Sequence, residues 1–191
     1  GFHFAAFDIG DLERGEVAFQ GTDINFEHVK AKKGDSRYEV SGLHIDLGRP
    51  LGAQLDMRAQ SANMSLDDVY AIFGLTGDPR WEDIKGHIGF DARARLISGG
   101  PEDRCGSGRL ELSVAGKVLA LDFLNERWNG GNADVDLVWD DFAGGGLGMD
   151  LDVRGATLKK KGGGTAIVSG KMSRGGKMDL LATATGIEIA S

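Results

Sequence analysis

Apolar and polar residues alternate along much of this 191-residue chain. The alternation is clearest in residues 43–47 (LHIDL), 88–96 (IGFDARARL) and 147–153 (LGMDLDV). A period of two places successive side chains on opposite faces of a β-strand, so each stretch has one apolar and one polar face. Such strands are typical of antiparallel sheets that expose one face to water. The sequence therefore predicts a mostly β protein whose strands share an apolar side.

Twelve strand-like segments follow one another, and glycine-containing turns separate many of them. Glycine and asparagine tolerate the positive φ angles of tight turns, so we expect a meander of short antiparallel hairpins. The predicted strands cover residues 2–9, 14–20, 22–30, 37–47, 51–60, 86–97, 108–116, 117–124, 132–139, 146–158, 164–173 and 177–185.

One segment, residues 65–74 (SLDDVYAIFG), departs from the period of two. Ser65 can cap a helix, Asp67 and Asp68 place negative charge in its first turn, and Gly74 can end it. Its apolar residues recur at helical spacing and would share one side. We expect one short helix near residues 65–74. Two roles stay open for it: packing on the end or edge of a sheet, and plugging or gating a binding groove.

Composition and charge argue against several functional classes for this protein. The net charge of −7 argues against a nucleic-acid partner, and no apolar run approaches the roughly 20 residues that span a bilayer. Cys105 is the sole cysteine, so no internal disulfide can form. The four histidines lack the local pairing of metal sites, and no nucleophile–base arrangement can be named. We predict that the protein is not an enzyme and has no cofactor or metal site.

The apolar sheet face needs a partner, because monomers rarely expose a contiguous apolar patch above a few hundred Å². Either a second sheet covers it in a closed sandwich or barrel, or the sheet bends into a trough around an extended apolar ligand. The residues on the apolar face are mostly aliphatic, with some methionine. Such a lining suits the acyl chains of a ligand slightly better than it suits a closed protein core. The residues predicted to line the groove are Leu43, Ile45, Leu47, Leu55, Met57, Ile88, Phe90, Leu110, Leu112, Leu137, Leu147, Met149 and Leu151.

Several turn-rich motifs lie within residues 65–189. They are DPRW at 78–81, GPEDRCGSG at 100–108, VWDDFAGG at 138–145, and LKKKGGGT at 158–165, the last continuing through Gly175-Gly176 to Gly186-Ile187. These stretches resemble the TamB branch of the AsmA-like superfamily, the translocation and assembly module proteins. The resemblance lies in the texture of strands and turns, with no signature of catalytic residues.

The resemblance implies a strongly curved antiparallel sheet that forms a hydrophobic, β-taco-like groove. It further implies that residues 1–191 are a single β-rich segment of a longer periplasmic protein anchored in the inner membrane. Such proteins take part in lipid transport and outer-membrane biogenesis, with phospholipid as ligand. Some work with an outer-membrane β-barrel partner, which would be contacted through other parts of the protein. Two alternatives stay open: an adhesin-like β-solenoid module with a closed core, and a β-sandwich carbohydrate-binding module.

Overall fold

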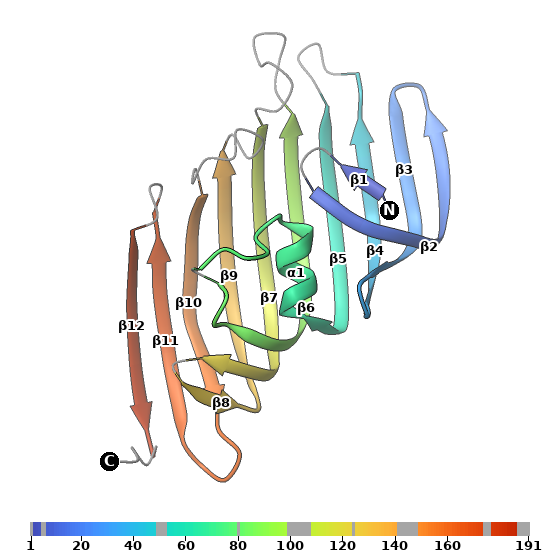
Figure 1. Cartoon of the computed structure of the whole chain (residues 1–191). Coiled ribbons are helices and arrows are strands. Elements are labelled where there is room, and N and C mark those ends of the chain that lie inside the picture. Colours follow the sequence, from blue (N-terminus) through green and yellow to red (C-terminus); the bar gives the residue numbers. More distant parts are fainter. Residues whose placement is uncertain are drawn as a thin grey trace.

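The described part of the protein forms a single curved antiparallel sheet with one short helix (Figure 1). Strands make up 76% of the structure, which confirms the predicted mostly β fold class. Among the described residues the sheet has twelve strands and does not close on itself. The computed structural model describes residues 2–4, 7–48, 53–79, 81–98, 108–123, 125–140, 149–173 and 177–186.

Neighbours in the sheet are mostly neighbours in sequence, so the predicted meander is confirmed. The order is β1-β2-β3-β4-β5-β6-β7-β9-β10-β11-β12, with β8 paired to β7 off this path. Helix α1 (Leu66–Ile72) connects β5 to β6. The strands are β1 (Phe2–Phe4), β2 (Phe7–Gln20), β3 (Asp23–Lys33), β4 (Ser36–Asp46), β5 (Gln54–Ser65), β6 (Lys85–Ser98), β7 (Gly108–Phe123), β8 (Glu126–Trp128), β9 (Gly131–Asp140), β10 (Met149–Lys159), β11 (Thr165–Met172) and β12 (Met178–Thr185).

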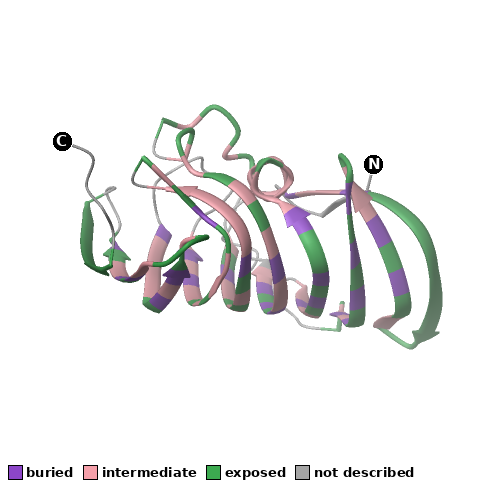
Figure 2. Ribbon diagram, turned by 90° about the horizontal axis from the view of Figure 1, so that it is seen from below, coloured by how far each residue is buried: buried purple, intermediate pink, exposed green. Residues whose placement is uncertain are grey.

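The sheet bends into a trough, and α1 lies on its concave side (Figure 2). Val69 and Ile72 of α1, with Phe73 directly after it, pack against the buried apolar cluster of the sheet. A second, smaller cluster forms at one end of the trough, where fully buried Trp128 of β8 packs with residues of β10 and β11. The hydrophobic core therefore lies along the inside of the curve.

Helix α1 begins as the sequence predicts. The Ser65 side chain accepts a hydrogen bond from the Asp67 backbone N–H at 3.2 Å, and Asp67 and Asp68 lie in the first turn. Gly74 follows the helix with φ of +66°, a conformation that glycine adopts without steric cost. None of the helical residues is fully buried.

Three strand predictions differ from the structure. Residues 2–9 and 14–20 were expected as two strands, but β2 is continuous from Phe7 because bulges at Leu12 and Arg14 absorb its irregular pattern. The predicted break after Gly116 is also wrong. Gly116 pairs with Phe90 on one side and Ala133 on the other, so β7 is unbroken. The three-residue strand β8 was not predicted.

Gly131 provides a stability test of the β9–β10 pairing. Its φ is +134°, and a Cβ there would lie 1.7 Å from the Thr157 carbonyl oxygen, so Gly131→Ala must displace one strand. We expect a loss of more than about 2 kcal/mol in the free energy of unfolding. Gly155→Ala is the control, because Gly155 has positive φ but no atom near its Cβ position, and should cost about 1 kcal/mol. Equal losses in denaturant titrations would contradict the clash.

Candidate functional site

An unbroken row of apolar side chains crosses the concave face from strand to strand. Residues directly opposite each other in adjacent strands share a face of the sheet. Seven strand spacings of about 4.8 Å give the row a length of about 34 Å along the sheet. The members of this apolar row, each paired with the next, are Phe19, Ile24, Ile45, Leu55, Leu96, Leu110, Trp139 and Met149.

A parallel row continues the apolar surface to the other edge of the sheet. It runs from β5 to β12 and consists of Met57, Ala94, Leu112, Leu137, Leu151, Met172 and Met178, again with each residue paired to the next. Leu180 belongs to the same face, since it is opposite Gly170, two residues before Met172. Together the two rows reach from β2 to β12.

The ends of this apolar surface are exposed and its middle is buried. Phe19 on β2 is 73% exposed and Leu180 on β12 is 44% exposed, whereas Leu110 in the middle is 4% exposed. A sheet enclosed in a sandwich buries its apolar face, including the outer strands. Here the apolar surface opens to solvent at both edges.

The structure brings most of the predicted groove residues together. Ile88 lines an apolar pocket below α1, while Leu147 lies outside the described residues. Leu47 does not join the others: it is 52% exposed, because β4 ends at Asp46 and the strand period no longer orients the next side chain. Contact of the predicted groove residues with lipid stays a prediction. The ten that fall in one apolar cluster are Leu43, Ile45, Leu55, Met57, Phe90, Leu110, Leu112, Leu137, Met149 and Leu151.

The sequence prediction missed several members of the rows. Leu96 and Trp139 lie in the middle, and Phe19 and Met178 lie at the two edges. Leu96 could have been found, because it continues the phase of Phe90 in the alternating stretch of β6. Phe19 and Met178 also follow a period of two, but their alternating stretches are shorter and give a weaker signal.

Three parts of the chain lie over the middle of the apolar row. They are residues Phe7–Gly10 of β2, helix α1, and Phe73. We call them the cover. The Phe7 ring packs edge-on against the Phe73 ring, with ring centroids 5.6 Å apart. It also packs edge-on against Trp139 of β9, with ring centroids 6.1 Å apart. Phe7 falls in a predicted strand and Phe73 falls on the apolar side of the predicted helix, but no local pattern indicates that the two rings meet over the row.

An apolar pocket of about 170 Å³ remains between the cover and the sheet. Phe7, Ile72 and Phe73 form its roof, and residues of β5, β6 and β7, such as Leu55 and Leu110, form its floor. Cavities of about 150 Å³ with apolar walls accept a molecule such as benzene. The pocket therefore has room for a short stretch of hydrocarbon without any change in the protein.

Polar contacts hold the cover in place. The Ser36 hydroxyl donates to Asp68 Oδ2 at 2.5 Å and accepts from the Ser65 backbone N–H at 2.9 Å, which ties the first turn of α1 to the start of β4. The Tyr38 hydroxyl donates to the Ile9 carbonyl oxygen, and burial raises the pKa of Tyr38. These contacts join the cover to the sheet at its edges.

Tyr70 of α1 predicts a pH dependence of stability. Its hydroxyl donates to the Ile84 carbonyl oxygen at 2.9 Å, and burial, with a smaller effect of Asp67, raises the pKa of Tyr70 from 10.0 to about 12. The unfolded chain ionises near pH 10, so this stabilisation is complete below pH 10 and is lost as pH rises toward 12. We expect the free energy of unfolding to fall more steeply between pH 10 and 12 in the native protein than in Tyr70→Phe. Equal slopes in denaturant titrations would contradict the assignment.

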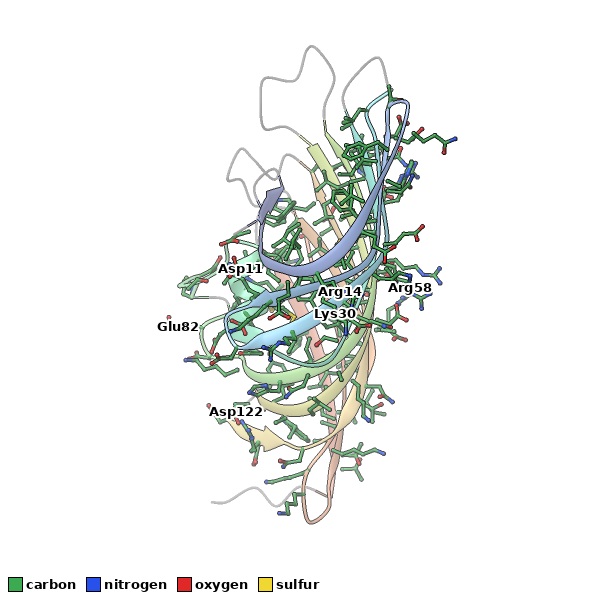
Figure 3. The ribbon with its side chains drawn as sticks, turned by 90° about the vertical axis from the view of Figure 1, so that its right-hand side faces the viewer. Asp11, Arg14, Lys30, Arg58, Glu82 and Asp122 are labelled. Atoms are coloured by element: carbon green, nitrogen blue, oxygen red, sulfur yellow. The ribbon has the colours of Figure 1, made fainter. Side chains whose placement is uncertain are left out.

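The convex face is polar and carries cross-strand ion pairs. Arg58, which points away from the molecule in Figure 3, pairs with Asp91 and holds the pKa of that carboxyl below its usual range. Further pairs join Arg154 to Asp136 at 2.9 Å and Lys171 to Asp152 at 3.2 Å. Exposed pairs of this kind add little stability. They lie on the face of the sheet opposite the apolar rows.

The part of the chain that the structure describes shows neither a metal site nor a membrane-spanning helix. No group of three or more His, Cys, Asp or Glu side chains there is arranged to hold a metal ion. No helix among these residues has the length and apolar character to cross a membrane. Comparison with protein-family models, curated proteins and solved structures gives no match.

Proposed function

We propose that this chain is a non-enzymatic segment of a lipid-transport protein whose concave face guides the acyl chains of phospholipids. One observation carries the proposal: the apolar surface crosses the sheet without a polar interruption and opens to solvent at both edges, at Phe19 and at Leu180. A hydrocarbon chain needs such a path, because each buried methylene gains about 0.8 kcal/mol and no polar group has to lose its water.

The dimensions favour a path over a single pocket. The apolar row is about 34 Å long at about 4.8 Å per strand, whereas the acyl chains of one leaflet span about 15 Å, half of the bilayer core. An acyl chain can therefore occupy only part of the row at a time. The headgroup would stay in water on the open side of the trough, and the chain would exchange one set of aliphatic contacts for the next.

The resemblance to TamB supplies the cellular setting of the proposal. It supports a periplasmic location, a phospholipid ligand and a role in outer-membrane biogenesis. It also supports an outer-membrane β-barrel partner, contacted through other parts of a longer protein. An inner-membrane anchor would likewise belong to those parts.

The two alternatives fit the structure less well. A β-solenoid module with a closed core would enclose its apolar face, but Phe19 and Leu180 reach solvent. A carbohydrate-binding module needs exposed tryptophan or tyrosine platforms for sugar rings. Trp128, Trp139 and Tyr38 are buried, and Trp81 and Tyr70 are partly buried. The apolar rows therefore favour lipid over sugar.

Two neighbouring leucines of β12 provide a direct test. Leu180 lies on the concave face, whereas Leu181 pairs with Ser169 on the convex face and is 70% exposed. Leu180→Asp places a charge beside a passing acyl chain, and we expect about tenfold less phospholipid to be retained, equivalent to about 1.4 kcal/mol. Leu181→Asp adds the same charge on the outer face and should retain the native amount.

The measurement is native mass spectrometry of gently purified protein, with phospholipid counted per chain. Both variants should keep the native unfolding temperature, because both side chains are already exposed. Phospholipid on the native protein and on Leu181→Asp, with loss from Leu180→Asp, would support the proposal. Absence of phospholipid from all three proteins, or equal retention by the two variants, would contradict it.

A further inference from the structure

The middle of the apolar row is covered by the lid, which we define as α1 with Phe73. The row is exposed at its ends and buried at Leu96 and Leu110, where Ile72 and Phe73 lie over it. The pocket left between them, about 170 Å³, has room for a short stretch of hydrocarbon. An acyl chain that follows the row from one edge to the other therefore meets the lid.

The lid is weakly held by apolar contacts. None of the seven residues of α1 is fully buried, and Val69, Ile72 and Phe73 are only partly buried. Isolated helices shorter than about 12 residues are marginal in water, so α1 depends on its contacts with the sheet. Segments with few buried contacts open at a small fraction of the free energy of global unfolding.

The strands that carry the lid are irregular at its base. The pairing of β5 with β6 shifts register between Ser61 and Met64, just before α1. The pairing of β6 with β7 shifts between His87 and Ile88, just after the chain returns to the sheet. Bulges disrupt the ladder and bend the strand locally. The lid therefore joins the sheet through two interrupted pairings.

One polar contact fastens the lid to a part of the sheet distant in sequence. Asp68 accepts a hydrogen bond from Ser36, a buried residue at the start of β4. The Asp68 carboxylate also fills the space above Gly34, where a Cβ would lie 2.0 Å from Asp68 Oδ1. We call the Ser36–Asp68 contact the latch. It is a side-chain contact, so it can break without unfolding any strand.

We propose that the lid is a gate: the latch holds it over the middle of the apolar row, and an acyl chain passes by displacing it. Val69, Ile72 and Phe73 occupy the site when no ligand is present. An acyl chain offers the sheet the same kind of contact, so the exchange is close to balanced in free energy. The gate rests on the proposed function and adds its regulation.

A disulfide across the latch tests the gate. The two side-chain oxygens of the latch are 2.5 Å apart, so Ser36→Cys with Asp68→Cys, in a Cys105→Ser background, places two thiols on residues whose side chains face each other. Loss of free thiol on oxidation shows that the disulfide has formed. The matched control is Ser113→Cys with Asp136→Cys. That pair has a similar Ser–Asp contact, at 2.7 Å, but joins β7 to β9 on the convex face.

The probe is cis-parinaric acid, a fluorescent fatty acid, and its association rate is measured by stopped flow with each variant oxidised and reduced. We expect oxidation of the latch pair to slow association at least about tenfold, and oxidation of the control pair to leave it unchanged. Equal rates for the oxidised and reduced latch pair would overturn the gate and leave the proposed function standing. Absence of probe binding to the reduced proteins and the native chain would overturn both.

Hydrogen exchange provides a second measurement that needs no disulfide. Asp68→Ala removes the latch and should raise amide exchange in residues 66–73 and speed probe association, whereas Asp67→Ala, in the same turn, should change neither strongly. Bound cis-parinaric acid should raise exchange in residues 66–73 of the native protein while the strands stay protected. Increased protection of the lid on binding would overturn the gate.

Discussion

Leu110→Asp should leave the protein unfolded at 25 °C. Leu110 lies in the middle of the apolar row, 4% exposed, with Leu96 and Trp139 opposite it in the adjacent strands. The change removes a packed side chain, which costs about 2–5 kcal/mol, and buries a carboxylate with no partner, which costs several more. The sum approaches the whole stability of a typical domain, about 5–15 kcal/mol.

Leu181→Asp is the matched control for this change, because it places the same charge on the convex face, where the leucine is already exposed. Circular dichroism and the dispersion of amide NMR signals should show Leu181→Asp folded and Leu110→Asp unfolded. A folded Leu110→Asp would mean that water reaches the middle of the row. In that case the lid would not close off the middle of the apolar row from solvent.

Phe7→Ala should lower the free energy of unfolding by about 3–5 kcal/mol and also speed the uptake of fatty acid. Phe7 is buried, and its ring contacts both Phe73 of the lid and Trp139 of the sheet. Its loss leaves a cavity in the cover and removes one of the contacts that hold the lid. The two effects share one cause, so they should appear together.

Phe19→Ala is the control for Phe7→Ala, since Phe19 belongs to the same strand but is exposed at the sheet edge. It should change stability by less than about 0.5 kcal/mol. Denaturant titration measures the stability of both variants, and stopped flow with cis-parinaric acid measures uptake. A Phe7→Ala protein that is destabilised but takes up the probe at the native rate would show that Phe7 does not hold the gate.

The sequence predicts this fold well because the period of two acts locally. Each alternating stretch orients its own side chains, so Leu55, Leu112 and Leu137 could be placed on one face before any pairing was known. The period fails where a strand ends, as at Leu47 after β4, and it misleads where a glycine lies inside a ladder, as Gly116 does in β7. Both errors concern where a strand ends, which depends on pairing with the neighbouring strand and cannot be derived from a local pattern.

The cover was only partly predictable. The composition of residues 65–74 predicts α1, its cap at Ser65 and its end near Gly74, all of which are confirmed. Its place over the middle of the row depends on the curvature of the sheet, which brings Phe7 and Trp139 together from distant parts of the chain. The latch between Ser36 and Asp68 is also a long-range contact, and no local pattern indicates it.

The central claim is that lipid contacts the concave face and not the convex one. A photoreactive amino acid at single positions tests it most directly, using Phe19, Met57 and Leu180 on the concave face, and Ala18, Arg58 and Leu181, the adjacent residues on the same strands, on the convex face. After irradiation with phospholipid vesicles, mass spectrometry should find phospholipid adducts at the three concave positions and none at their neighbours. Adducts at both faces alike, or at no position, would contradict the account.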